Sequence, residues 1–145
     1  MLKNIVISTS ETLTQLGDDE CALLVYEPLL SSVHPLQKKA KVLSVGFHDI
    51  VPNALFGHAL AGLTPFDKGM ARKILEFVAF YDADPLSWTL RIACPHGRAR
   101  GNSLAAGLAR LYPNVTVEGS VIPESVNSYV TGLLTEGDRY LLVAK

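Results

Sequence analysis

Short apolar runs alternate along the chain with longer stretches in which apolar residues recur every three or four positions. The short runs are rich in valine, isoleucine and leucine and are bounded by polar residues, glycine or proline, a pattern typical of buried strands. The longer stretches have the period of amphipathic helices. Strands are expected over residues 4–8, 22–26, 41–47 and 86–93, with a short extended piece over 115–117. Helices are expected over residues 11–16, 66–81 and 102–111, and from Pro123 through Leu134, before an apolar tail over 140–143.

Capping residues mark the ends of several expected helices. Ser10 can cap the first helix, and Gly17 ends it. Thr64 and Pro65 suit the cap and the first turn of the second helix. Asn102 can cap the third. The helical assignments therefore rest on end signals as well as on periodicity.

The alternation of strands and helices defines the expected fold class. It predicts an α/β domain with a central, mostly parallel sheet flanked by helices on both faces. A length of 145 residues fits one domain with one core. We therefore expect a single domain that spans residues 1–145.

Composition narrows the function classes. With 48% hydrophobic and 19% charged residues, the chain has the make-up of a globular domain rather than a disordered segment. The net charge of −1 lacks the basic excess typical of nucleic-acid and membrane-surface binding, so neither partner is expected. Cys21 and Cys94 are interpreted as reduced thiols, because a core of this size needs no disulfide. The first residues lack the long apolar segment of a secretion signal, which favours a cytoplasmic protein.

The segment from Cys94 to Arg100 carries the strongest chemical signal. It reads Cys-Pro-His-Gly-Arg-Ala-Arg and lies between an expected strand and an expected helix. A loop at a helix N-terminus directs backbone N–H groups and the positive end of the helix dipole at one spot, which suits a phosphate. Arg100 can bind two phosphate oxygens side by side. The loop residues expected to contact the substrate are Pro95, His96, Gly97, Arg98 and Ala99.

Cys94 is the candidate nucleophile of this loop. The dipoles that bind a phosphate also stabilise a thiolate. A thiolate can displace the alcohol of a phosphomonoester and form a cysteinyl-phosphate, which water then hydrolyses. This chemistry requires no metal or cofactor, and the four histidines are scattered without the spacing of zinc ligands.

The loop resembles a known family signature. Residues 94–100 resemble the phosphate-binding signature of the protein tyrosine phosphatase superfamily, and the chain length resembles its compact dual-specificity class. A small bacterial group of predicted tyrosine phosphatases is similar over about residues 22–143, with Asp49 and Ile50 at its Asp-Ile pair. The resemblance implies a phosphotyrosine protein phosphatase-like fold and a cysteine-dependent hydrolase. It also implies a phosphorylated protein or a small phosphoester as substrate.

A carboxylic acid must protonate the leaving alcohol in this chemistry. Asp49 is the first candidate, since it ends an expected strand and the resemblance places the acid there. Asp67 is the second candidate, although the start of a helix is a common place for a structural aspartate. Asp82 and Asp84 are excluded because they precede the strand that leads to Cys94 and so lie at its far end. A turn-forming role for Asp49 is the structural alternative.

Two positions depart from the family pattern and keep other hypotheses open. Ala93 stands where the family has histidine, and Gly101 where it has a serine or threonine that assists release of the thiolate. Ser103 is a possible substitute for that hydroxyl. The second hypothesis is therefore a phosphate- or phosphoprotein-binding module with impaired turnover. A rhodanese-like sulfur-transfer domain and a buried cysteine before an arginine-rich turn are the remaining alternatives.

Overall fold

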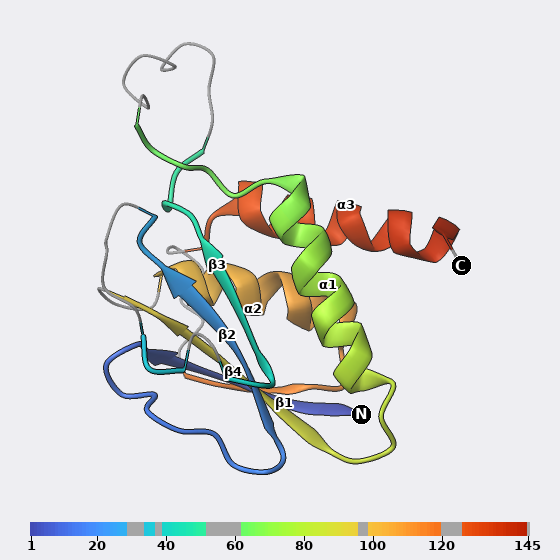
Figure 1. Ribbon diagram of the computed structural model, residues 1–145. Coiled ribbons are helices and arrows are strands. Elements are labelled where there is room, and N and C mark those ends of the chain that lie inside the picture. The colour runs from blue at the N-terminus through green and yellow to red at the C-terminus, as the bar shows by residue number, and fades with distance from the viewer. Residues whose placement is uncertain (29–33, 37–38, 52–61, 96–98, 120–125, 145) are drawn as a thin grey trace.

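The computed structural model describes residues 1–28, 34–36, 39–51, 62–95, 99–119 and 126–144, with the side chains of the last segment as far as Gly137. Its strands are β1 (Leu2–Thr9), β2 (Glu20–Tyr26), β3 (Val42–Gly46), β4 (Trp88–Cys94) and β5 (Thr116–Glu118). Its helices are α1 (Lys68–Asp82), α2 (Ala99–Leu111) and α3 (Ser128–Ala144) (Figure 1).

The strands form one sheet in the order β3-β2-β4-β1-β5. Every pairing is parallel, and β4 lies between β2 and β1, with Ile92 opposite Leu23 on one side and Ile7 on the other. The predicted α/β fold with a parallel sheet flanked by helices is confirmed. Because the strands are parallel, their carboxyl ends meet at one edge of the sheet, where ligands commonly bind in such folds.

All three described helices pack on the same face of the sheet, with α3 against both α1 and α2 (Figure 1). The main core lies between this face and the helices. On the opposite face, Leu13 and Leu36 from irregular chain pack on Ala22, Leu24 and Ala93 of the sheet. The expectation of helices on both faces is therefore wrong for the described part of the chain.

The segment 11–16 explains this difference, because it was predicted to be a helix and has no helical residue. Thr12 instead forms a turn, in which its backbone N–H and its hydroxyl both donate to the carbonyl of Thr9, at 3.2 and 2.9 Å. A helix of six residues makes too few hydrogen bonds to offset the cost of nucleation. Threonine hydroxyls also compete for backbone partners. The chain therefore passes from β1 to β2 as a loop.

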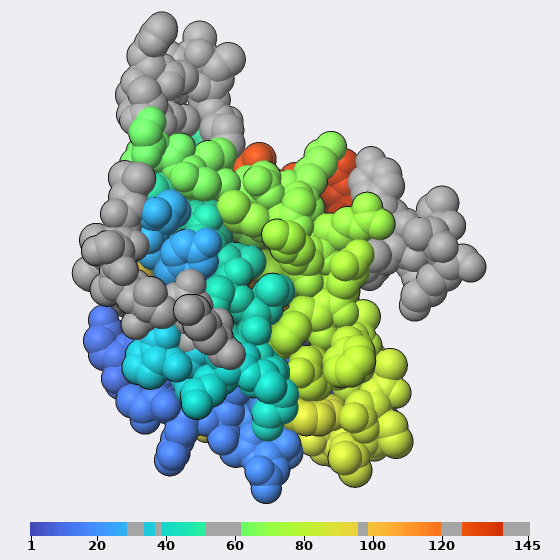
Figure 2. All heavy atoms as spheres, viewed as in Figure 1, coloured from blue at the N-terminus to red at the C-terminus, as the bar shows by residue number. Residues whose placement is uncertain are grey.

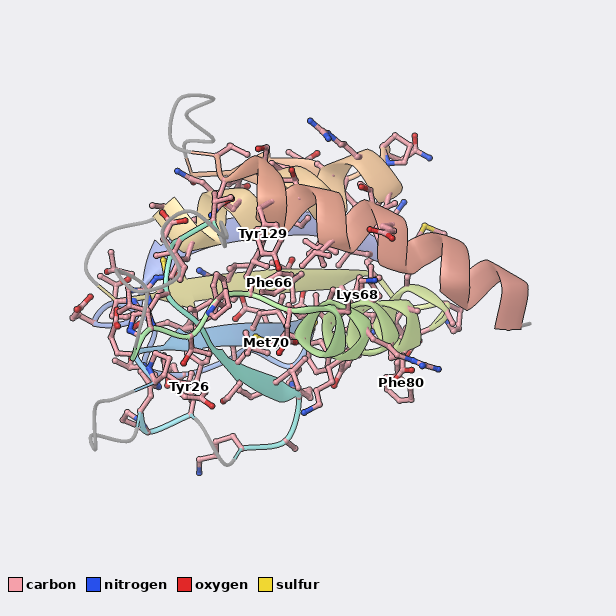
Figure 3. All side chains as sticks on the ribbon, turned by 90° about the horizontal axis from the view of Figure 1, so that it is seen from above. Tyr26, Phe66, Lys68, Met70, Phe80 and Tyr129 are labelled. Carbon is pink, nitrogen blue, oxygen red and sulfur yellow. The ribbon has the colours of Figure 1, made fainter. Side chains whose placement is uncertain are left out.

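α1 packs on the sheet through one apolar face, with Ala71, Ile74, Leu75, Val78 and Tyr81 buried. Phe66, just before the helix and labelled in Figure 3, meets Phe47, the residue after β3, edge-on, with ring centroids 4.8 Å apart. The helix starts later than Thr64 and Pro65 predicted, because Asp67 is its cap and accepts the N–H of Met70 at 2.8 Å. Figure 2 shows α1 forming the surface of the molecule beside the residues of β3.

α2 and α3 also begin at residues that the sequence did not single out. α2 begins at Ala99, so Asn102 lies buried inside the helix rather than at its cap. α3 begins after Asn127, whose Oδ1 accepts the N–H of Tyr129 at 3.0 Å. The predicted start at Pro123 lies outside the described residues, and the predicted tail over 140–143 is part of α3. None of the described helices has the length and apolar character to cross a bilayer.

Candidate active site

The carboxyl ends of three neighbouring strands surround a small pocket. Glu27 follows β2, His48 and Asp49 follow β3, and Pro95 follows β4. Together with Ala99 and Arg100 of α2 they line a pocket of about 260 Å³. The connection that leaves β2 runs to β3 on one side, and the connection that leaves β4 runs to β5 on the other. The pocket thus lies at the switch point between β2 and β4, where parallel sheets open a crevice for ligands.

Cys94 is the last residue of β4 and is only 1% exposed. The backbone N–H groups of Arg100 and Gly101, in the first turn of α2, donate to its sulfur. A Cβ at Gly101 would be in ordinary contact with the Cys94 Sγ, at 3.6 Å, but only 3.1 Å from the Ile7 Cγ2, so the absent side chain makes room for Ile7. The early start of α2 therefore directs two amides and the helix dipole at the thiol.

The surroundings of Cys94 act on its pKa in opposite directions. Burial raises the pKa of the thiol and is the largest effect. The amide of Gly101 and the guanidinium and amide of Arg100 lower it, whereas the charge of Asp49 raises it. The balance leaves the pKa above its ordinary value, so the thiol is protonated at neutral pH when the pocket holds no ligand.

Arg100 lies across the pocket in a buried position. Its Nη1 donates to the carbonyl of Phe47 at 2.9 Å, and its Nη2 donates to the Glu27 Oε1 at 2.6 Å and to the Pro95 carbonyl at 3.2 Å. The Arg100 side chain is 8% exposed, and Glu27 is its ion-pair partner. These contacts use three of the five N–H groups of the guanidinium and connect the ends of β2, β3 and β4.

Glu27 also faces a histidine. Its Oε2 lies 3.5 Å from the Nε2 of His48. The Nδ1 of His48 accepts the backbone N–H of Thr64 at 2.8 Å, so the proton of a neutral imidazole is on Nε2 and faces the carboxylate. The two carboxylate oxygens of Glu27 therefore face different partners, the guanidinium of Arg100 and the ring of His48.

Asp49 lines the same pocket and is hydrogen-bonded to a residue just before α3. Its Oδ1 accepts a hydrogen bond from the Asn127 Nδ2 at 3.1 Å, and the same amide donates to the Ile50 carbonyl at 3.1 Å. The backbone N–H of Asn127 donates to the Ser103 Oγ at 2.8 Å, which in turn donates to the Ala99 carbonyl at 3.1 Å. Asn127 thus ties the loop of Asp49 to the start of α2.

The other residues considered from the sequence lie as follows. Pro95 and Ala99 line the pocket, whereas His96, Gly97 and Arg98 lie outside the described residues. Asp67 caps α1. Asp82 accepts the N–H of Leu2 and Asp84 that of Leu86, both at the amino ends of β1 and β4, as expected. The hydroxyl of Ser103 is buried and bonded between α2 and α3.

Sequence reasoning missed Glu27, His48 and Asn127. Glu27 and His48 each follow a strand of the predicted parallel sheet, and that position was an available signal. Asn127 left no such signal, because only the packing of α3 brings it to Asp49. Among the described residues, no three His, Cys, Asp or Glu side chains gather as a metal site.

The chain matches no protein-family model, and no curated protein or solved structure is significantly similar to it.

Proposed function

We propose that the protein hydrolyses phosphomonoesters through Cys94, in the manner of a cysteine-dependent phosphotyrosine or dual-specificity phosphatase. The observation that carries the proposal is the sulfur of Cys94, which receives the N–H groups of Arg100 and Gly101 at the start of α2. Arg100 and Asp49 line the adjacent pocket. A candidate nucleophile, an oxyanion site and an acid thus lie at the same carboxyl edge of the sheet.

The chemistry assigns each group one role. The Cys94 thiol gives its proton to the Asp49 carboxylate, and the resulting thiolate attacks phosphorus, so that an S–P bond forms while the P–O bond to the alcohol breaks. Asp49, as the carboxylic acid, gives its proton to the departing oxygen. Water then attacks phosphorus, its proton passes to the Asp49 carboxylate, and the thiolate leaves as inorganic phosphate forms. Arg100 and the two amides stabilise charge on the phosphoryl oxygens in both steps.

A second candidate function is phosphate or phosphoprotein binding with little turnover. Gly101 supplies no hydroxyl beside the sulfur, and the Ser103 hydroxyl is bonded to the backbone of Ala99 and Asn127 instead. Burial also holds the pKa of Cys94 above its ordinary value. These features slow formation of the thiolate and its release from the intermediate, but they leave the oxyanion site in place.

Hydrolysis of p-nitrophenyl phosphate without added metal, from roughly pH 5 to 9, tests the proposal. Turnover should vanish in Cys94→Ser and fall about a hundredfold in Asp49→Asn, the size of a typical general-acid contribution. Asp67→Asn is the matched control, because it alters a carboxylate outside the pocket. Vanadate binding that depends on Arg100, with no turnover, would select the binding function. Neither turnover nor binding would refute both.

A further inference from the structure

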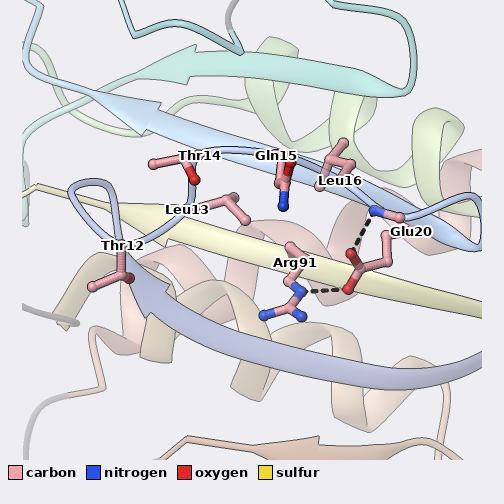
Figure 4. A pocket seen from close by; sticks show the side chains of 8 residues that line it. Thr12, Leu13, Thr14, Gln15, Leu16, Glu20 and Arg91 are labelled. Carbon is pink, nitrogen blue, oxygen red and sulfur yellow. Dashed lines mark hydrogen bonds and ion pairs between the residues drawn. The ribbon is translucent and has the colours of Figure 1, made fainter.

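A second pocket lies on the face of the sheet opposite the helices, and the proposed function does not involve it. Its volume is about 550 Å³, and it is lined by the chain from Thr12 to Gly17 together with Glu20 and Arg91 (Figure 4). Small-molecule sites commonly have volumes of roughly 300–1,000 Å³. The pocket is therefore large enough for a metabolite-sized ligand.

Arg91 is an unusual residue for its place in the sheet. It is in the middle of β4, opposite Ala22 of β2 and Val6 of β1. Its side chain leaves the sheet on the same face as that of Ala93, because residues two apart on a strand share a face. Inner strands of parallel sheets are usually apolar on both faces, so a charged side chain here needs a specific partner.

Glu20 is that partner for one end of the guanidinium. Its Oε2 accepts a hydrogen bond from the Arg91 Nε at 2.6 Å, and its Oε1 accepts the N–H of Gly17 at 2.7 Å. Burial acts to raise the pKa of Glu20, but the hydrogen bonds from Gly17 and Arg91 and the charges of Arg91 and Lys41 outweigh it and lower the pKa. Glu20 is thus an ionised group that orients Arg91 and the loop together.

The two terminal amino groups of the Arg91 guanidinium do not contact Glu20. Figure 4 shows them pointing away from Glu20, and within the described residues they donate to no protein acceptor. The side chain is 34% exposed, so a solute can reach it. Thr14 and Gln15 line the same pocket and carry a hydroxyl and an amide, whereas the Thr12 hydroxyl already donates to the Thr9 carbonyl. The pocket therefore offers a cationic fork with neutral hydrogen-bonding groups around it.

The charges of Arg91 and Glu20 indicate which class of anion this pocket can bind. The terminal edge of a guanidinium binds two oxygens of a carboxylate or a phosphate side by side. Because Glu20 already neutralises Arg91, a phosphate dianion would place excess negative charge beside a carboxylate, whereas a monoanion adds a single charge. We propose that this pocket is a second ligand site, which binds a small organic molecule through one carboxylate held by Arg91.

Amide NMR of the full ¹⁵N-labelled chain tests this site apart from the first. The probes are acetate, lactate and benzoate, with inorganic phosphate as the competing anion. At least one carboxylate should shift the amides of residues 12–17 and Glu20, and phosphate should do so more weakly at equal concentration. Signals of Ala99 and Arg100, which line the first pocket, report binding there, so the outcome here does not depend on the proposed phosphatase activity.

Arg91→Gln is the decisive variant, since it keeps a polar side chain beside Glu20 and removes the cationic fork. It should weaken carboxylate binding roughly ten- to a hundredfold, the loss expected for charge-assisted hydrogen bonds. Arg72→Gln is the matched control, because Arg72 also pairs with a glutamate through Nε, at 3.1 Å, but on the exposed side of α1. The Arg72→Gln variant should bind the carboxylate as tightly as the unaltered chain does. If Arg91→Gln does not fold, Thr14→Val replaces it and should weaken binding severalfold.

Three results would overturn the proposal. The first is no shift of residues 12–17 with any carboxylate up to about 10 mM, a concentration that saturates a millimolar site. The second is binding as tight in Arg91→Gln, or in Thr14→Val where that replaces it, as in the unaltered chain. The third is phosphate binding at residues 12–17 that equals or exceeds that of the carboxylates.

Discussion

The Oε1 of Glu27 lies 2.6 Å from the Nη2 of Arg100, so the arginine proposed to bind phosphate is already paired with a carboxylate. Glu27 follows β2 and Arg100 is in the first turn of α2, and the pair closes one side of the pocket. A phosphate that binds Arg100 therefore also meets the negative charge of Glu27. We therefore expect the affinity of the proposed site for anions to depend on Glu27, a residue with no role in the proposed chemistry.

Glu27→Gln should strengthen the binding of phosphate or vanadate by about tenfold. The amide oxygen of glutamine can still accept from Arg100, whereas the repulsion between the carboxylate and a dianion is removed, and one charge at this range is worth ~1–2 kcal/mol. Calorimetric titration with vanadate measures the change. Glu76→Gln, which breaks the exposed pair with Arg72, is the control and should leave affinity unaltered. Weaker binding in Glu27→Gln would mean that Glu27 mainly positions Arg100.

Asn127 should matter most for substrates with poor leaving groups. Its Nδ2 holds Asp49, and its Oδ1 caps α3. Asn127→Ser keeps a capping oxygen and removes the contact with Asp49. We expect kcat to fall about tenfold with phenyl phosphate and little with p-nitrophenyl phosphate, because only the poorer leaving group depends strongly on the acid. An equal loss with both substrates would indicate a purely structural role.

Gly101→Ser should accelerate hydrolysis of the covalent intermediate. A Cβ at this position lies in ordinary contact with the Cys94 Sγ at 3.6 Å, so a hydroxyl there can reach the sulfur. The Ile7 Cγ2, at 3.1 Å, must shift by a few tenths of an ångström. Gly101→Ala adds the same Cβ without the hydroxyl and is the matched control. Burst and steady-state kinetics compare the rates at which the two variants hydrolyse the intermediate. Equal rates in Gly101→Ser and Gly101→Ala would refute the prediction.

Alkylation of Cys94 by iodoacetamide should become faster as pH rises through the alkaline range, without a plateau near neutrality. Burial, and then the charge of Asp49, favour the protonated thiol, so the reactive thiolate forms only at high pH. Asp49→Asn removes one of these effects and should speed the reaction at a given pH. Cys21→Ser is the background for the assay, since burial raises the pKa of Cys21 to about 12 and its thiol is also 1% exposed. A rate that levels off near neutral pH would contradict the raised pKa.

Much of the scaffold was predictable because it follows from local patterns. The apolar runs of β1, β2, β3 and β4 and the stripe of α1 have the periods of buried strands and of an amphipathic helix. The spacing from Cys94 to Arg100 predicted a strand, a loop and a helix in this order, and Arg100, Pro95, Ala99 and Asp49 line one pocket there. The catalytic roles of these residues remain predictions.

The sequence by itself determined the α/β class, the parallel sheet and the position of Cys94 before a helix, because hydrophobic period and loop composition are properties of neighbouring residues. Only the tertiary structure decided which strands adjoin, that the described helices share one face, and that Glu27 and Asn127 reach Arg100 and Asp49. Those contacts join residues 73 and 78 positions apart. No local pattern encodes them, since they depend on how the crossovers return each strand to the sheet.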